Sequence, residues 1–400
     1  MASSSAQQMR DWTGPAVLSF GFRPFFFLGS LWAALAMVLW VGMLAGGISL
    51  PMAFDPVDWH AHAFIIGYLG AIVSGFLLTA VPNWTGRLPV VGWRLGLLAA
   101  LWIIGRGAMM TSVHLPPVVV ALLDMSFLIA LAAMLTREIV AGKNWRNLIV
   151  LVMLLALITG GLLFHWQAAQ GEVAARAAGF RVMLGAAVMM ISVIGGRIIP
   201  SFTRNWLAGQ GSTARPVPPM ARFDKATLVL TLLAILLWVF APRTDPTGIA
   251  LILAGLVQAL RLSRWCGHHC LSEPLVWVLH AGYVFIPVGA LALGVGILGH
   301  GTFDPAAGQH LWMAGAIGLM TLAVMTRATL GHTGRDLTAG SATTMIYLAL
   351  IAAVLVRLLA GFMPSSADVL YALSGGSWCL AFIGFAVIYG PLLLRPRPTR

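Results

Sequence analysis

Residues 65–84 read IIGYLGAIVSGFLLTAVPNW and contain no charged side chain, and the residues just before them, 59–64, read WHAHAF. A helix of this length crosses about 30 Å of hydrocarbon at ~1.5 Å per residue. The two histidines at its start are polar, and lipid offers imidazole no hydrogen-bonding partner. We therefore expect His60 and His62 to be used by another part of the protein.

The composition of the whole chain is that of an integral membrane protein. Of its 400 residues, 60% are hydrophobic and only 9% are charged, whereas soluble domains average roughly a quarter charged residues. Backbone groups in lipid must be satisfied within helices, so we predict an all-α, polytopic bundle that forms a single membrane domain over 1–400. About twelve transmembrane helices are expected, near 25–47, 61–81, 93–113, 117–136, 147–168, 178–199, 225–242, 247–262, 274–298, 310–330, 343–361 and 370–394.

The net charge of +12 is distributed as membrane topology requires. With both termini in the cytoplasm, most Lys and Arg fall on the inner side, and the outer loops hold only Arg176 and Arg243. The charge therefore does not indicate a nucleic-acid partner. It favours a multi-pass membrane protein with N- and C-termini in the cytoplasm and a cytoplasmic linker at 203–224 between the sixth and seventh helices.

Three helices share a pattern that suggests an internal repeat. The stretches 70–87, 185–205 and 315–335 each begin with Gly-Ala and end on the inner side with Thr and Arg. They are the second, sixth and tenth helices, so the pattern is compatible with three four-helix units. The alternative is convergent use of small residues at helix interfaces.

Histidine is the most informative residue type in these helices. His60, His62 and His310 lie at outer helix ends, and His280 and His332 lie toward the inner side. Each could be a hydrogen-bonded structural residue, but five on three helices favour metal or heme, since neutral imidazole is the commonest metal ligand. Residues i and i+2 of a helix point about 200° apart, so His60 and His62 are expected to serve different centres, or a single centre if that turn is not yet helical.

Five arginines are expected near one another at the inner membrane face. Forked guanidinium groups bind carboxylates and phosphates, so the cluster suits heme propionates, lipid headgroups or a small anion. The alternative is that these arginines only set the topology. They are Arg23, Arg87, Arg197, Arg327 and Arg335.

Other polar groups are given structural roles. Asp124 is the only carboxylate well inside a predicted span, and we favour a structural hydrogen bond over a proton relay for it. The motif CGHHC (266–270) lacks a second Cys/His pair, so we do not expect it to bind metal. His114, His165 and His300 lie at or beyond helix ends, where water can solvate them.

Several motifs together resemble the NnrS family of bacterial membrane proteins. They are GFRPFFFLGSL, WHAHAF, GFLLTAVPNWTGR, GGRIIPSFTRN, EPLVWVLHAGYVFIPVGAL and AIGLMTLAVMTRATLGHTGR, and the resemblance runs from about residue 20 to 390. It implies an inner-membrane protein with heme b and copper, linked to denitrification and to nitric oxide stress. The matching residues are the five histidines and five arginines named above. Ala63 departs from the family pattern, which commonly has Glu there.

Two functions of different classes follow as expectations. The first is a heme/copper protein that binds nitric oxide and removes it or protects against it, with His60, His62 and His310 as reacting residues. If the protein reduced nitric oxide to nitrous oxide, it would be an oxidoreductase. Its expected partners are then an electron donor and membrane lipid. The second is a non-catalytic nitric oxide sensor or a heme- or copper-handling protein. A secondary transporter is less favoured, because intramembrane carboxylates are so few.

Overall fold

A computed structural model describes residues 12–87, 89–299 and 305–396. His300 and the two chain ends, on which the topology prediction partly rests, lie outside these ranges. The described residues form helices and no strand. The main elements are α2 (Phe22–Leu44), α3 (Pro56–His62), α4 (Gly70–Thr85), α5 (Trp93–Met110), α6 (Pro117–Ala141), α7 (Leu148–Ala169), α8 (Ala178–Gly209), α9 (Arg222–Phe240), α10 (Asp245–Ser263), α11 (Pro274–Leu298), α12 (Pro305–His310), α13 (Leu319–Thr333), α14 (Ser341–Phe362) and α15 (Ala367–Leu394).

The predicted polytopic helical bundle is confirmed. Counting α3–α4 and α12–α13 each as one continuous rod, the described chain contains twelve long helices. Eleven of them are long and apolar enough to cross a membrane, and α5 is the twelfth. Proline begins several of these helices, including α3 and α6, because the first turn of a helix needs no backbone N–H bond there.

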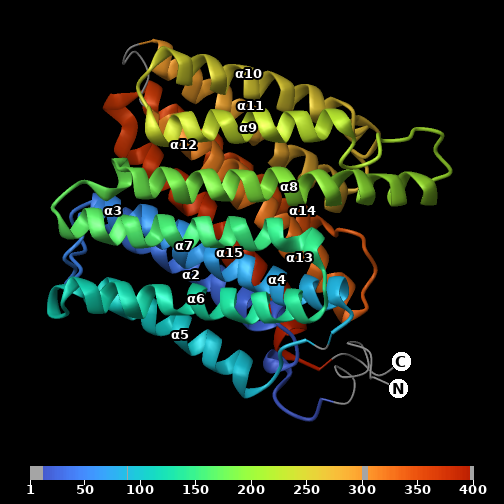
Figure 1. Cartoon of the computed structure of the whole chain (residues 1–400), viewed down its shortest axis with the longest axis horizontal. Coiled ribbons are helices and arrows are strands. Elements are labelled where there is room, and N and C mark those ends of the chain that lie inside the picture. Colours follow the sequence, from blue (N-terminus) through green and yellow to red (C-terminus); the bar gives the residue numbers. More distant parts are fainter. Residues whose placement is uncertain (1–11, 88, 300–304, 397–400) are drawn as a thin grey trace. The chain divides into compact units, whose positions relative to one another are not determined.

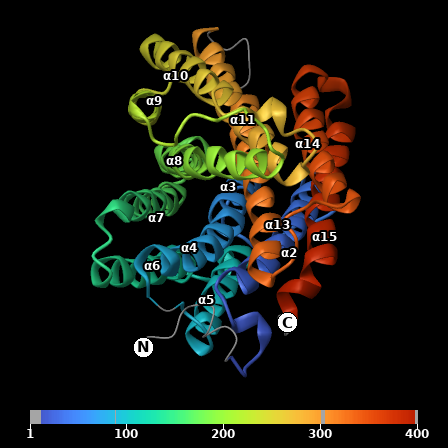
Figure 2. The same cartoon turned by 90° about the vertical axis from the view of Figure 1, so that its right-hand side faces the viewer.

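The chain divides into two compact units. Unit 1 comprises residues 1–183, 328–335 and 382–400, and unit 2 comprises 184–327 and 336–381. In unit 1, α6 packs against α4, α5 and α7 (Figure 2). In unit 2, α10 packs against both α9 and α11, and the three helices lie near one another in Figure 1. The prediction of one membrane domain remains a prediction.

Two of the helices contain a π-helical stretch. The segment η2 (Ala63–Leu69) directly follows His62, and η7 (Leu311–Gly318) directly follows His310. The two histidines also lie at the same distance before a Thr-Gly-Arg sequence, at 85–87 and 333–335. π-Helical turns are rare and occur frequently at functional sites. The segments η2 and η7 make the second and tenth helices similar to each other. The sixth helix, α8, is α-helical over its length, so the three-fold repeat remains a prediction.

The linker between α8 and α9 is shorter than expected. The helix α8 continues to Gly209, past the predicted start of the linker at 203, and α9 begins at Arg222. Pro200 lies inside α8 and does not end it. The sequence pattern placed the end too early because proline and charged residues usually mark a helix end, while this helix extends beyond its apolar part.

A buried polar network lies inside unit 2. The guanidinium of Arg261 on α10 donates from Nε to Asp224 Oδ1 at 2.7 Å, and from Nη1 to the Ser192 carbonyl oxygen at 2.9 Å and to Tyr283 Oη at 2.8 Å. Tyr283 in turn donates to Gln258 Oε1 at 2.7 Å. Both members of the Arg261–Asp224 ion pair are buried, so the network joins α8, α9, α10 and α11 within this unit.

Candidate metal centre

The first turn of α3 is anchored at two points. Asp55 caps the helix by accepting a hydrogen bond from the Val57 amide at 2.8 Å. Asp58, one turn further on, is buried and accepts from the amides of Ala174 and Ala175 at 3.1 and 2.7 Å. These bonds fix α3 against the segment before α8, and thereby fix the position of the histidines at its end.

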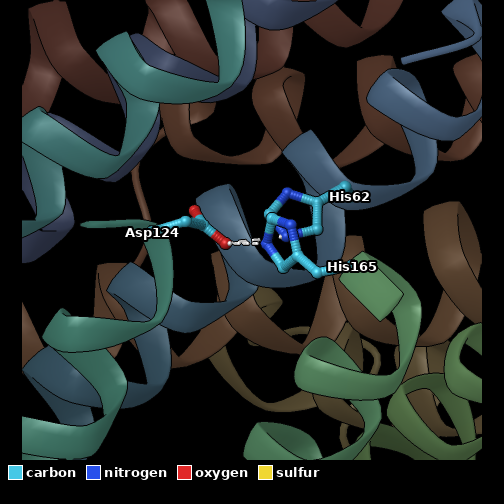
Figure 3. A group of neighbouring side chains, drawn as sticks. All are labelled: His62, Asp124 and His165. Atoms are coloured by element: carbon cyan, nitrogen blue, oxygen red, sulfur yellow. Dashed lines mark hydrogen bonds and ion pairs between the residues drawn. The ribbon is translucent and has the colours of Figure 1, made fainter. Parts of the chain in front are cut away.

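Three side chains of the types that can bind metal, from different helices, meet in unit 1. His62 ends α3, Asp124 lies on α6, and His165 lies on α7 (Figure 3). Both histidine Nε2 atoms lie 2.9 Å from the same oxygen, Asp124 Oδ2. One ligand atom from each residue lies within 4.8 Å of the others. The three residues are 0%, 0% and 6% exposed, so the group is shielded from water.

The two histidines approach the carboxylate differently. His165 forms a hydrogen bond with Asp124, in which the imidazole donates. His62 is equally close, but neither of its buried ring nitrogens has a hydrogen-bond partner in suitable geometry. A buried polar atom without a partner costs free energy, and a metal ion would satisfy it. Coordination through Nε2 requires the tautomer that carries its proton on Nδ1.

Arg106 holds the other oxygen of the carboxylate. Its Nη2 forms a buried ion pair with Asp124 Oδ1. The guanidinium carbon lies 5.9 Å from the ring centre of Trp32 and 6.0 Å from that of Trp102. Gly67 makes this packing possible, because a β-carbon there would lie 2.7 Å from Arg106 Nη1. Arg106 is therefore a fixed positive charge beside the metal-ligating group.

The same two tryptophans hold the π-helical segment that follows His62. Trp32 Nε1 donates to the Ala63 carbonyl oxygen and Trp102 Nε1 donates to the Gly67 carbonyl oxygen, each at 2.9 Å. Buried indole N–H groups normally find such partners. These bonds fix the backbone of η2, and the segment in turn orients His62 at its start.

Aromatic rings cover the group. The Phe164 ring centre lies 5.3 Å from that of His62, and the Phe54 ring centre lies 5.7 Å from that of His165. The two imidazoles are 5.2 Å apart and nearly perpendicular. This environment is apolar and excludes water, which strengthens electrostatic interactions inside it.

His60 lies in different surroundings from His62, as the spacing of the two residues predicts. Its ring stacks on Trp40 with centroids 4.2 Å apart and contacts Phe64 at 5.0 Å. It is half-buried, and it is not a member of the His62–Asp124–His165 group.

The other three predicted histidines lie apart from this group. In unit 2, His280 on α11 forms a 2.8 Å hydrogen bond with Thr203, and His310 Nδ1 lies 2.6 Å from the Ala306 carbonyl oxygen. In unit 1, the His332 ring centre lies 5.5 Å from Phe20 and 5.4 Å from Phe22. Their roles as ligands remain predictions.

The five predicted arginines have separate local contacts. In unit 1, Arg23 is buried, with Nη1 within 3.2 Å of three carbonyl oxygens at the end of α15, those of Leu392, Leu393 and Arg395. Arg87 pairs with Glu138, and Arg335 is exposed. In unit 2, Arg327 lies over the Phe202 ring at 4.1 Å, and Arg197 is half-buried. A shared anion site therefore remains a prediction.

The CGHHC motif forms a packed turn. Cys270 is buried against Leu207 and Val276, and burial, together with nearby Cys266, raises the pKa of its thiol to about 11. The apolar packing of this side chain is compatible with a structural role. That the motif binds no metal remains a prediction.

Replacing both cysteines should therefore leave metal binding intact. We expect the Cys266→Ser, Cys270→Ser double variant to keep whatever metal content the unchanged protein has, with a small loss of thermal stability from the buried hydroxyl at position 270. Metal analysis of the purified variant beside the unchanged protein measures this. A drop in copper would assign the motif a ligand role.

Sequence reasoning missed two members of the group. His165 was placed at a solvated helix end, yet it lies inside α7 and is buried, and Arg106 was given no role. A signal was present, because Asp124 is a carboxylate inside an apolar helix and requires cationic or hydrogen-bonding partners. Arg106 and His165 lie on the two helices adjacent to it in the chain. His114 is exposed, as expected.

Comparison with known proteins gives one match. A family model described as NnrS protein matches residues 16–397, nearly the whole chain. No curated protein matches it. The matched range includes every residue of the candidate centre and all five predicted histidines.

Proposed function

The chain belongs to the NnrS family of nitric-oxide-related membrane proteins, and on this premise we propose that it binds nitric oxide at a copper centre and protects against nitrosative stress. The residues that would hold copper are His62, His165 and Asp124. The observation that supports this most is the buried group itself, in which His62 has two ring nitrogens without hydrogen-bond partners.

The donor set fits copper. Imidazole suits copper, zinc and iron, whereas carboxylate-rich sites suit magnesium and calcium. Here two imidazoles share one carboxylate, and Arg106 already occupies one of its oxygens. Bound copper supplies a one-electron centre that coordinates nitric oxide.

The residues of the chain prepare this centre for an uncharged diatomic ligand. Asp124 lies 2.9 Å from the Nε2 atoms of both imidazoles and so brings the three donor groups together. Phe54 and Phe164 exclude water beside them. Nitric oxide is small and uncharged, so it concentrates in the apolar phase that surrounds these helices.

We assign heme b to His310 within the same proposal. The His310 Nδ1 contact with the Ala306 carbonyl oxygen fixes the tautomer in which Nε2 carries the lone pair. A backbone carbonyl commonly plays this part behind a metal-bound histidine. His310 also directly precedes the π-helical segment η7, as His62 directly precedes η2.

Reduction to nitrous oxide is the catalytic extension of this proposal. It consumes two nitric oxide molecules, two electrons and two protons, so it requires a proton route. The buried carboxylates described in unit 1 are already committed: Asp58 to two backbone amides, Asp124 to Arg106 and the histidines, and Glu138 to Arg87 and Arg137. This favours binding without turnover, which is the second function considered from the sequence.

Anaerobic addition of nitric oxide to purified protein tests the proposal. We expect one spectral change per centre, a copper component that His62→Ala removes, and a heme band that His310→Ala removes or shifts. Gas analysis with an electron donor present separates the two functions, since sustained nitrous oxide production identifies an enzyme and a single stoichiometric uptake identifies a binder. Protein that contains neither metal nor heme would contradict the proposal.

A further inference from the structure

The charges around the candidate centre cancel before any metal binds. Asp124 contributes one negative charge and Arg106 one positive charge, while the two histidines coordinate metal as neutral imidazoles. Arg106 Nη2 and Asp124 Oδ1 form a buried ion pair. The group therefore differs from a usual carboxylate-containing metal site, in which the carboxylate offsets part of the ion's charge.

Arg106 cannot move away from this position easily. It is 3% exposed, packs beside the rings of Trp32 and Trp102, and abuts Gly67. The tryptophans are themselves held by bonds to the backbone of η2. Its charge is permanent, because guanidinium does not lose its proton in proteins.

A metal ion entering this centre thus brings charge that nothing nearby offsets. The cost of burying an ion rises with the square of its charge, so an uncompensated divalent ion costs roughly four times as much as a monovalent one. Divalent hard ions also depend more on carboxylate oxygen, and one oxygen of Asp124 is already taken by Arg106. Imidazole nitrogen alone suffices for monovalent copper.

We propose that Arg106 makes the His62–Asp124–His165 centre selective for Cu(I) over divalent ions and raises the reduction potential of bound copper. This rests on the proposed copper centre. Arg106 touches no metal in this account and acts through the carboxylate that it neutralises, so it is a selectivity-determining residue rather than a ligand.

The test compares variants that change the charge with variants that keep it. Arg106→Gln leaves Asp124 uncompensated, Arg106→Lys keeps the positive charge, and the double variant Arg106→Gln, Asp124→Asn removes both charges together. Each protein is titrated with Cu(I) against a chelator and with Co²⁺ and Zn²⁺. The midpoint potential of bound copper is followed by the Cu(II) electron paramagnetic resonance signal.

We expect Arg106→Gln to bind Co²⁺ and Zn²⁺ roughly tenfold or more tightly than the unchanged protein, since one charge is removed a few ångströms from the ion. Its copper potential should fall. Arg106→Lys and the double variant should keep the preference for Cu(I). If Arg106→Gln does not fold, the test rests on the double variant Arg106→Gln, Asp124→Asn. Tighter binding of Co²⁺ and Zn²⁺ by that variant than by the unchanged protein would overturn the inference.

Failure of the inference can be distinguished from failure of the proposed function. Unchanged protein that holds Zn²⁺ as tightly as Cu(I), with no effect of Arg106→Gln on affinity or potential, overturns the role of Arg106 and leaves the metal centre standing. If the purified protein binds no metal, or binds only metal that His62→Ala does not remove, both the role of Arg106 and the proposed metal centre are overturned. Cu(I) selectivity that follows the net charge of the Arg106–Asp124 pair supports the inference.

Discussion

Alanine at His165 is expected to weaken copper binding by more than roughly a hundredfold, because losing even an outer-shell partner of a metal site commonly costs 10- to 100-fold. The same result is expected for His62→Ala. The two imidazoles come from α7 and α3 and meet at one carboxylate oxygen. Copper content of the purified variants, measured with competing chelator present, checks the prediction.

His60→Ala is the matched control for these variants. It removes an imidazole two residues from His62 in the same turn, but this ring stacks on Trp40 and is not part of the group. It should leave copper binding within about threefold of the unchanged protein. Equal copper loss from His60→Ala and His62→Ala would mean that the effect is general damage to α3.

Arg261→Ala is expected to destabilise unit 2 by about 3–5 kcal/mol, the usual cost of removing one partner of a buried ion pair. The substitution leaves the Asp224 carboxylate buried without its cation and removes the donor to Tyr283. The free energy of unfolding in mixed detergent micelles, compared with that of the unchanged protein, measures the effect.

Two further variants separate charge burial from loss of packing. Arg264→Ala, one turn along at the end of α10, removes only a guanidinium over the Phe223 ring and should cost about 1 kcal/mol or less. The pair Arg261→Met, Asp224→Leu removes both charges and should be less destabilised than Arg261→Ala alone. An Arg261→Ala variant as stable as Arg264→Ala would show that the network carries little energy.

Hydropathy was sufficient to predict the helices. Spans such as 65–84 are long, uncharged and apolar, and lipid permits only helices for such segments, so composition and length determine the element. The end of α8 was missed because its last turns are polar and extend past the apolar part. There, hydropathy no longer reports on helix formation.

The candidate site could be predicted only in part. The opposite directions of His60 and His62 follow from helix geometry alone, and the structure places them accordingly. The contact between His62 and His165 cannot be predicted from helix geometry, because the two residues are more than a hundred positions apart in the sequence. It depends on how α3, α6 and α7 pack, and no local pattern encodes that packing.

The π-helical segments were beyond sequence reasoning. A π turn changes the hydrogen-bonding partner by one residue and leaves composition and hydropathy the same. In η2 it depends on tertiary contacts, namely the indole N–H groups of Trp32 and Trp102 and the lack of a side chain at Gly67. Trp32, Trp102 and Gly67 also pack against Arg106. The same residues therefore contact both the π-helical backbone of η2 and the positive charge beside Asp124.

X-ray absorption at the copper edge of purified, copper-loaded protein tests the central claim most directly. The account predicts a first shell of two imidazole nitrogens at about 2.0 Å, lost in His62→Ala and His165→Ala and kept in Cys266→Ser, Cys270→Ser. A first shell of sulfur, or an imidazole shell unchanged in both histidine variants, would contradict it.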